Sequence, residues 1–354
     1  MKITQMLERE DFYAINQKTL DAFFGDEGEN STLYIYPQLN AIIPKKPSKR
    51  VKQYLLCEYA VRGNVAKRMA VRGYVRLCLA SRGRMSGARC IVRKGVSPDM
   101  LIYPCNKKHR IFDFGNNSVS VVIKDGFPTG DLENEIAFRT REDLPDFVPR
   151  LLSHSEGGYT EAIIDGVPLA RVSEGFEEKK KEAYSMLREW SADHDREVDG
   201  TEYARTLAER ILSYPREKIL SKERLSSVTN ALAAIAEEQE RLMLSFSHGD
   251  LQAGNIWIEN GSGKIYIIDW ESFAERSVYY DEETLFGGLR PGDIAAYLQK
   301  KEKTARTATV LLEDILFRLG DLYGLPSDFG SAAFDTYLAS IDAFLSDTNP
   351  YNEV

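Results

Sequence analysis

The chain has 354 residues and a formal net charge of −8, from 46 lysines and arginines against 54 aspartates and glutamates. Hydrophobic residues make up 43% and charged residues 28%, which is ordinary for a globular protein and excludes gross disorder. The length is that of two or three domains, and no apolar run is long enough to span a bilayer. The first ten residues turn charged at once, without the apolar stretch of a secretory signal, so a cytoplasmic location is expected.

Positive charge is concentrated in one block of the chain. Residues 45–110 contain 18 lysines and arginines and only two acids, so this block carries +16 and the remainder carries −24. The asymmetry indicates an anionic partner, which is a membrane surface or a glycolipid in it, nucleic acid, or the acidic remainder of the same chain. Apolar residues interleaved with the basic ones suit a helix lying at the inner face of a membrane. No nucleic-acid-binding motif is present, so nucleic acid is not expected.

The predicted elements change character along the chain. Strands are expected at residues 100–103, 110–114 and 118–124, a short helix at 132–140, and further strands at 147–152 and 159–164. Beyond residue 172, apolar residues recur at helical spacing over 183–190, 203–211, 225–242 and 334–345. The sequence therefore predicts an α+β protein with a basic N-terminal extension over 1–95, a β-rich lobe over 96–170 and a larger, mostly helical lobe over 171–354.

A β-hairpin is expected inside the helical lobe. Two short strands, 256–259 and 264–268, flank a turn that begins at Asn260-Gly261. Asn255 precedes the first strand and Asp269 follows the second, so an antiparallel pairing brings an amide oxygen and a carboxylate together. Oxygen ligands of this kind suit Mg²⁺, and a further carboxylate at Asp250 can orient a hydroxyl and take its proton. Enzymes that transfer phosphoryl groups use a bound metal ion and a catalytic carboxylate of this kind.

Two motifs carry a family resemblance. The segments H-G-D-L-Q-A-G-N at 248–255 and I-I-D-W-E at 267–271 resemble the aminoglycoside phosphotransferase and choline kinase family. Gly249 stands where protein kinases usually have Arg, and Asp-Trp-Glu stands where they have D-F-G, so the small-molecule branch is favoured. The resemblance implies a two-lobed protein-kinase-like fold, with a small β-rich N-lobe and a larger, mostly helical C-lobe. Residues 1–95 have no counterpart in the core family.

The resemblance also implies roles for individual residues. Asp250 would be the catalytic base, Asn255 and Asp269 would hold Mg²⁺, His248 would brace the loop, and Glu271 would support metal or substrate. ATP or GTP would be the co-substrate.

Nucleotide-binding residues are implied in the β-rich lobe. Lys124 would hold the α- and β-phosphates, and Glu135, with Glu133 as its rival, would orient that lysine. The backbone of Ala162, Ile163 and Ile164 would bind the base. One departure stands out, because the turn expected to cover the phosphates, residues 104–109, contains no glycine.

The expected function is transfer of a γ-phosphoryl group to a hydroxyl of a small molecule or glycan. The basic block favours an anionic or membrane-borne acceptor, whereas acidic pockets of this family often receive cations. The alternatives are a catalytically silent, kinase-like binding module that docks through its basic region, and a kinase directed at proteins.

Overall fold

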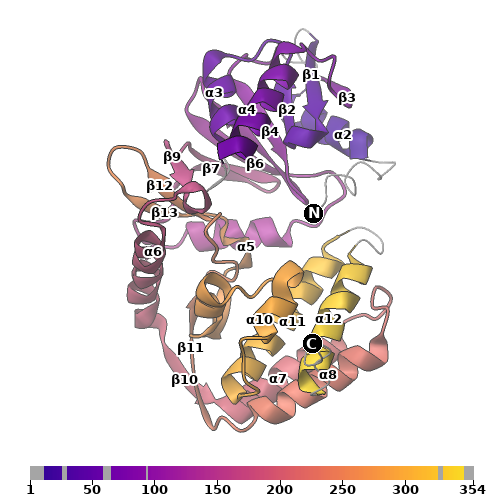
Figure 1. Cartoon of the computed structure of the whole chain (residues 1–354), viewed down its shortest axis with the longest axis vertical. Helices are drawn as coiled ribbons and strands as arrows, with labels where there is room; N and C mark the ends of the chain where they lie inside the picture. The colour runs from indigo at the N-terminus through magenta and orange to yellow at the C-terminus, as the bar shows by residue number, and fades with distance from the viewer. Residues whose placement is uncertain (1–11, 26–29, 59–64, 93–94, 326–329, 347–354) are drawn as a thin grey trace. The chain divides into compact units, whose positions relative to one another are not determined.

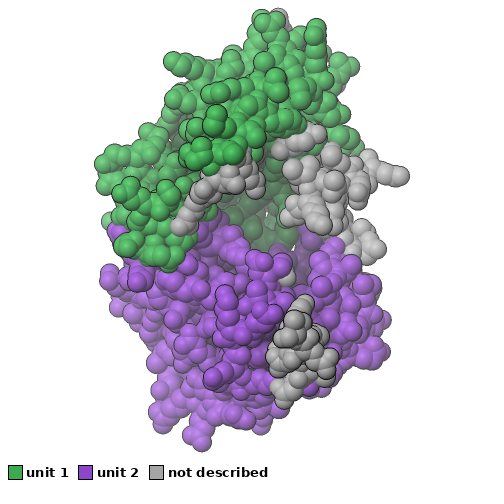
Figure 2. Space-filling model, in the orientation of Figure 1, with its two compact units in different colours: residues 1–179, 256–271 green, residues 180–255, 272–354 purple. Residues whose placement is uncertain are grey.

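The computed structural model describes residues 12–25, 30–58, 65–92, 95–325 and 330–346. The chain forms two compact units, Met1–Lys179 with Ile256–Glu271 (unit 1), and Lys180–Asn255 with Ser272–Val354 (unit 2), coloured separately in Figure 2. The N-terminal segment expected to lack a secretory signal lies outside the described residues, as do Arg62, Arg93 and Lys94 of the basic block. Within the described residues, no helix combines the length and apolar character needed to cross a membrane.

Unit 1 is built on an eight-stranded sheet of order β3-β1-β2-β4-β5-β6-β8-β7. Every pairing in it is antiparallel. The strands are β1 (Ser31–Tyr36), β2 (Ala41–Pro44), β3 (Ala88–Val92), β4 (Met100–Pro104), β5 (Lys108–Asp113), β6 (Ser118–Ile123), β7 (Leu151–Ser155) and β8 (Gly158–Ala162). The segment expected as an N-terminal extension therefore contributes three strands to the sheet that also holds the strands predicted for the N-lobe.

Helices cover both faces of this sheet. Leu20 and Phe24 of α2 (Phe12–Phe24) pack with Ile111 of β5 and the partly buried Val122 of β6. On the other face, α3 (Lys49–Glu58) and α4 (Val65–Ala80) pack with Phe112 of β5 and Val119 of β6. Figure 1 shows α3 and α4 together on one side of the strands and α2 apart from them. Because neighbouring residues of a strand point to opposite faces, β5 sends its residues alternately toward these two layers.

The segment between β6 and β8 contains the predicted short helix. The helix α5 (Gly130–Arg139) confirms the prediction at 132–140, with Asp131 and Glu133 in its first turn. The strand predicted at 147–152 is displaced, because β7 begins at Leu151 and the carbonyl of Phe147 accepts the backbone N–H of Ile267 instead.

The predicted hairpin is present. The strands β12 (Ile256–Glu259) and β13 (Ile265–Ile267) are antiparallel, with Ile256 opposite Ile267, and β12 also pairs with β9 (Gly166–Pro168). These three strands form a small second sheet in unit 1.

Unit 2 is mostly helical, as expected. Its core joins α7 (Gly200–Ser213), α8 (Lys222–Ala236), α10 (Ile294–Leu298), α11 (Ala305–Tyr323) and α12 (Ser331–Leu345). A three-stranded sheet of β10 (Arg196–Asp199), β11 (Arg241–Ser247) and β14 (Ala274–Ser277) adjoins them, and α6 (Phe176–Ser191) leads in from unit 1. The short helix α9 (Tyr280–Glu282) follows β14.

One helical prediction extends too far. The stripe read as continuous from Leu225 to Leu242 is interrupted, because α8 ends at Ala236 and Leu242 lies in β11. Both segments bury apolar residues in unit 2, so their hydrophobic pattern alone did not separate the helix from the strand.

Candidate active site

The loop after β11 is held by a carboxylate from another part of unit 2. Asp281 in α9 accepts the backbone N–H of His248 at 2.8 Å and that of Gly249 at 3.1 Å. The neighbouring Tyr280 is fully buried and donates its hydroxyl to Asp314 of α11 at 2.9 Å. The buried helix α11 therefore anchors α9, and α9 sets the path of the loop.

Gly249 meets a steric requirement of this loop. Its φ is +83°, and a Cβ at this position would lie 2.3 Å from the backbone oxygen of Ser272. Only glycine satisfies both conditions without a shift of the backbone. His248 is fully buried and its Nδ1 accepts the backbone N–H of Asp250 at 3.2 Å, which is a bracing role.

Asp250 and Asn255 contact each other within this loop. The Nδ2 of Asn255 donates to the backbone oxygen of Asp250 at 2.9 Å and to its Oδ2 at 3.2 Å. Gln252 donates to the same Oδ2 at 2.8 Å, and Arg290 lies 3.9 Å from Oδ1. The Asp250 side chain is 32% exposed, so its carboxylate is oriented by neighbours yet still accessible. Because the amide nitrogen of Asn255 faces Asp250, its oxygen is the atom able to ligate a cation.

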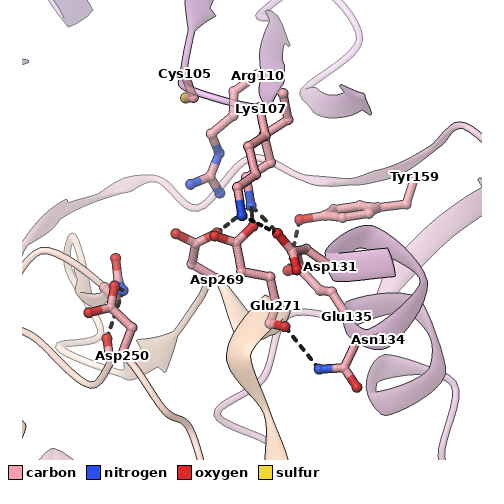
Figure 3. Close-up of polar contacts among 12 residues, drawn as sticks. Cys105, Lys107, Arg110, Asp131, Asn134, Glu135, Tyr159, Asp250, Asp269 and Glu271 are labelled. Carbon is pink, nitrogen blue, oxygen red and sulfur yellow. Dashed lines mark hydrogen bonds and ion pairs between the residues drawn. The ribbon is translucent and has the colours of Figure 1, made fainter. Parts of the chain in front are cut away.

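A second cluster of polar side chains lies in unit 1, around Lys108 of β5. Its Nζ lies 2.6 Å from Oδ1 of Asp269, 2.6 Å from Oε2 of Glu271 and 3.7 Å from Oε2 of Glu135. Figure 3 shows the carboxylates of Asp269, Glu271 and Glu135 converging, and one oxygen of each lies within 4.8 Å of the others. These partners raise the pKa of Lys108 well above its ordinary value despite the opposing effect of burial. The lysine is therefore protonated.

The carboxylates of this cluster differ in surroundings. Asp269 follows β13 with a φ of +71°, which aspartate tolerates better than most residues. Burial, together with the charge of Asp269, raises the pKa of Glu271 to about 7. The cluster thus gathers three carboxyl groups around one ammonium group.

A buried network fixes Glu135 in α5. Its Oε1 accepts the hydroxyl of Tyr159 at 2.8 Å and lies 3.4 Å from Nη1 of Arg139. Arg139 also donates to Glu161 of β8 at 2.6 Å, and Arg110 of β5 lies 3.4 Å from the same carboxylate. Glu135 is fully buried, and its rival Glu133 instead accepts the hydroxyl of Thr129. Of the two glutamates, Glu135 is the one that lies near the ammonium group of Lys108.

The remaining predicted residues lie elsewhere in unit 1. Lys124 is buried just beyond β6, and its backbone N–H donates to the oxygen of Lys107 at 2.9 Å. Ala162 ends β8 and is exposed. The backbone N–H of Ile163 donates to the backbone oxygen of Asn117, and the backbone oxygen of Ile164 accepts the N–H of Gly166.

Several site residues escaped the sequence prediction. Lys108, Arg110 and Tyr159 belong to the cluster in unit 1, and Asp281 and Arg290 belong to the loop in unit 2. The alternation of β5 could have placed Lys108 and Arg110 on one face of the sheet. The sequence offers no comparable indication for Asp281, which follows Gly249 by 32 positions.

No protein-family model matches the sequence. No curated protein matches it either. Solved structures similar to this one include the choline kinase LicA from Streptococcus pneumoniae, with a TM-score of 0.43 and 15% identity over 70% of this chain and 91% of that one.

Two other similar structures bear related names. A thermostable mutant of the aminoglycoside phosphotransferase APH(4)-Ia, in complex with ADP and hygromycin B, has a TM-score of 0.48 and 14% identity over 71% of this chain and 94% of that one. The ethanolamine kinase of Plasmodium vivax has a TM-score of 0.40 and 13% identity over 84% of this chain and 95% of that one. These three structures are thus named as a choline kinase, an aminoglycoside phosphotransferase and an ethanolamine kinase.

Proposed function

We propose that this protein is a Mg²⁺- and nucleotide-dependent phosphotransferase that phosphorylates a hydroxyl group of a small molecule or glycan. The observation that carries the proposal is the geometry of Asp250. Two amide donors orient its carboxylate, which remains partly exposed, on a loop anchored through Asp281. A fixed, accessible carboxylate is what alignment and deprotonation of an acceptor hydroxyl require.

The donor set suits a magnesium ion. Asn255 offers an amide oxygen and Asp269 a carboxylate, both of them hard oxygen ligands. The carboxyl oxygens of Asp269, Glu271 and Glu135, which lie within 4.8 Å of one another, support binding of a divalent cation there. When bound, Mg²⁺ would neutralise charge on the phosphates of the nucleotide.

Other residues of unit 1 would position the nucleotide. Glu135 is held rigidly by Tyr159 and Arg139, so it can orient a lysine toward the phosphates. Lys124, predicted from the sequence, and Lys108, which contacts Glu135 in the structure, are the two candidates. The backbone between Ala162 and Ile164 would bind the base of ATP or GTP.

The basic block supports an anionic or membrane-borne acceptor. Residues at its C-terminal end pair within the chain, Lys107 with Asp131 and Lys108 with Asp269. By contrast, Lys49 and Lys52 of α3 and Arg76 of α4 are exposed. Exposed apolar residues lie on α4 as well, with Met69 at 69% and Leu77 at 62% exposure. Exposed cations beside exposed apolar side chains are the composition of a surface that binds anionic lipid.

The decisive experiment measures phosphate incorporation from labelled ATP and GTP into a panel of hydroxylated metabolites and glycans, with Mg²⁺ and with chelator. Substitution Asp250→Ala should lower the rate by at least ~100-fold, the scale of general-base catalysis. The exposed Asp193 of unit 2 provides the matched control, Asp193→Ala, which should retain activity. A wild-type chain that neither binds nucleotide nor transfers phosphate would instead be the silent binding module.

A further inference from the structure

The pairing of the strands shows which face of the sheet carries Lys108, one of the two candidate lysines. In the pairing of β5 with β6, Lys108 lies opposite Ile123 and Arg110 lies opposite Val121. In the pairing of β6 with β8, Val121 lies opposite Tyr159. Directly opposed residues share a face, so Lys108, Arg110, Val121 and Tyr159 lie on the same side. The hydroxyl of Tyr159 binds Glu135, which places that glutamate on the face of Lys108.

Lys124 lies just beyond the end of β6, whose last residue paired with β5 is Ile123, opposite Lys108. The residue after it, Asp125, donates its backbone N–H to Oγ1 of Thr19 in α2 at 3.0 Å. The helix α2 covers the face that includes Ile111 and Val122, opposite to that of Phe112 and Val119. The side chain of Asp125 also pairs with Lys18 of α2 at 2.9 Å, so the contacts of this segment with α2 are made by Asp125.

The strand β6 presents no lysine on the Glu135 face. Its central residue there is Val121, which is apolar and fully buried. Adjacent strands are only about 4.8 Å apart, and a lysine side chain is long enough to bridge that spacing. The ammonium group of a lysine on β5 can therefore lie in front of β6. Lys108 extends in this way, because its ammonium group contacts Asp269, Glu271 and Glu135.

We propose that Lys108, rather than Lys124, is the lysine that binds the phosphates of the nucleotide. The inference rests on the proposed function, because it assigns a residue to the nucleotide of that reaction. An ammonium group has three donor hydrogens, so it can contact Glu135 and a phosphate oxygen at the same time. The turn before β5 has no glycine, and Lys108 gives this part of the chain a charged contact with the nucleotide in its place.

The test compares the affinity of matched lysine variants for AMP-PNP, a nucleotide that is not hydrolysed, by calorimetry at saturating Mg²⁺. Lys108→Gln should raise Kd at least ~10-fold, since a hydrogen bond to a charged group contributes about 1.5–3 kcal/mol. Lys124→Gln should leave Kd within about twofold of wild type. Lys46→Gln, at an exposed lysine elsewhere in unit 1, is the control and should behave likewise.

The outcomes separate this inference from the proposed function. Loss of affinity in Lys124→Gln, or equal loss in both variants, would overturn the assignment while leaving nucleotide binding intact. No binding of AMP-PNP by the wild type would overturn the proposed function and the assignment together. Thermal melts of the unliganded variants show whether each is folded.

A second readout needs no variant. In a crystal structure of the wild-type chain with AMP-PNP and Mg²⁺, Nζ of Lys108 should lie within hydrogen-bonding distance of a phosphate oxygen. Nζ of Lys124 at that position, with Lys108 still confined to the carboxylates, would refute the proposal.

Discussion

The carboxylate of Asp281 accepts the backbone N–H of Gly249 at 3.1 Å, so α9 directly restrains the loop that carries Asp250. The other oxygen of Asp281 accepts the N–H of His248, so both oxygens are used by adjacent backbone groups. An asparagine would present an amino group to one of these N–H donors and leave it without an acceptor.

Asp281→Asn should therefore destabilise unit 2 by about 1–3 kcal/mol, the cost of an unsatisfied buried donor. The rate of phosphoryl transfer should fall by ~10-fold or more, because the loop loses its fixed path. Urea denaturation and steady-state kinetics measure the two effects. Asp293→Asn, at an exposed position of the same unit, is the control. An unchanged rate in Asp281→Asn would show that the loop does not need this restraint.

Gly249→Ala should be more damaging than the small size of a methyl group suggests. The left-handed φ costs an alanine about 1–2 kcal/mol, and its Cβ would lie 2.3 Å from the oxygen of Ser272. We expect a loss of more than ~2 kcal/mol in the free energy of unfolding, measured by chemical denaturation. Gly292→Ala, where no atom lies within 4 Å of an added Cβ, should cost less than ~1 kcal/mol. Equal stabilities of the two variants would contradict the steric argument.

His109 predicts a pH dependence of stability. It is fully buried, and within the described part of the chain neither ring nitrogen has a hydrogen-bond partner. Burial, with the nearby charge of Lys124, lowers its pKa from 6.5 to about 3. Below pH 6.5 the unfolded chain therefore binds a proton at this residue that the folded chain does not, so its contribution to stability falls as pH decreases toward 3.

The slope from this one group approaches ~1.4 kcal/mol per pH unit. His109→Leu should remove it, so that the free energy of unfolding falls less steeply between pH 6 and 4 than in the wild type. His154→Leu, at an exposed histidine of β7, should keep the wild-type slope. Parallel pH profiles for His109→Leu and wild type would show that His109 is protonated in the folded state.

Binding to anionic membranes should depend on the exposed cations of α3 and α4. Deletion of residues 1–95 would remove β1, β2 and β3 from the sheet, so charge reversal is the sharper test. The triple variant Lys49→Glu, Lys52→Glu and Arg76→Glu should lose flotation with phosphatidylserine vesicles, and wild-type binding should weaken as salt increases. Reversal of Lys181, Lys222 and Lys300, which are exposed in unit 2, is the matched control. Equal flotation of both triple variants would exclude this surface.

Local sequence was sufficient to predict the hairpin and the elements beside it. The alternation of residues 256–259 and 265–267 and the intervening turn specify antiparallel pairing, and the structure shows Ile256 opposite Ile267. The helix near 132–140 and the mostly helical character of unit 2 also follow from local patterns. The roles of Asp250, Asn255 and Asp269 stay predictions that rest on the motifs.

Only the tertiary structure placed Lys108 beside Glu135. That contact depends on which face of β5 packs against α5, and this face is set by the register between the strands. The register cannot be predicted from the sequence of each strand taken separately. The same holds for Asp281, whose contact with Gly249 is made through the packing of α9 on α11. It also holds for β1, β2 and β3, which extend the sheet of unit 1, because an edge strand pairs with its neighbour through backbone hydrogen bonds that any sequence can make. Periodicity and turn chemistry are local properties of a sequence, whereas the choice of partner across a sheet is settled by packing over the whole unit.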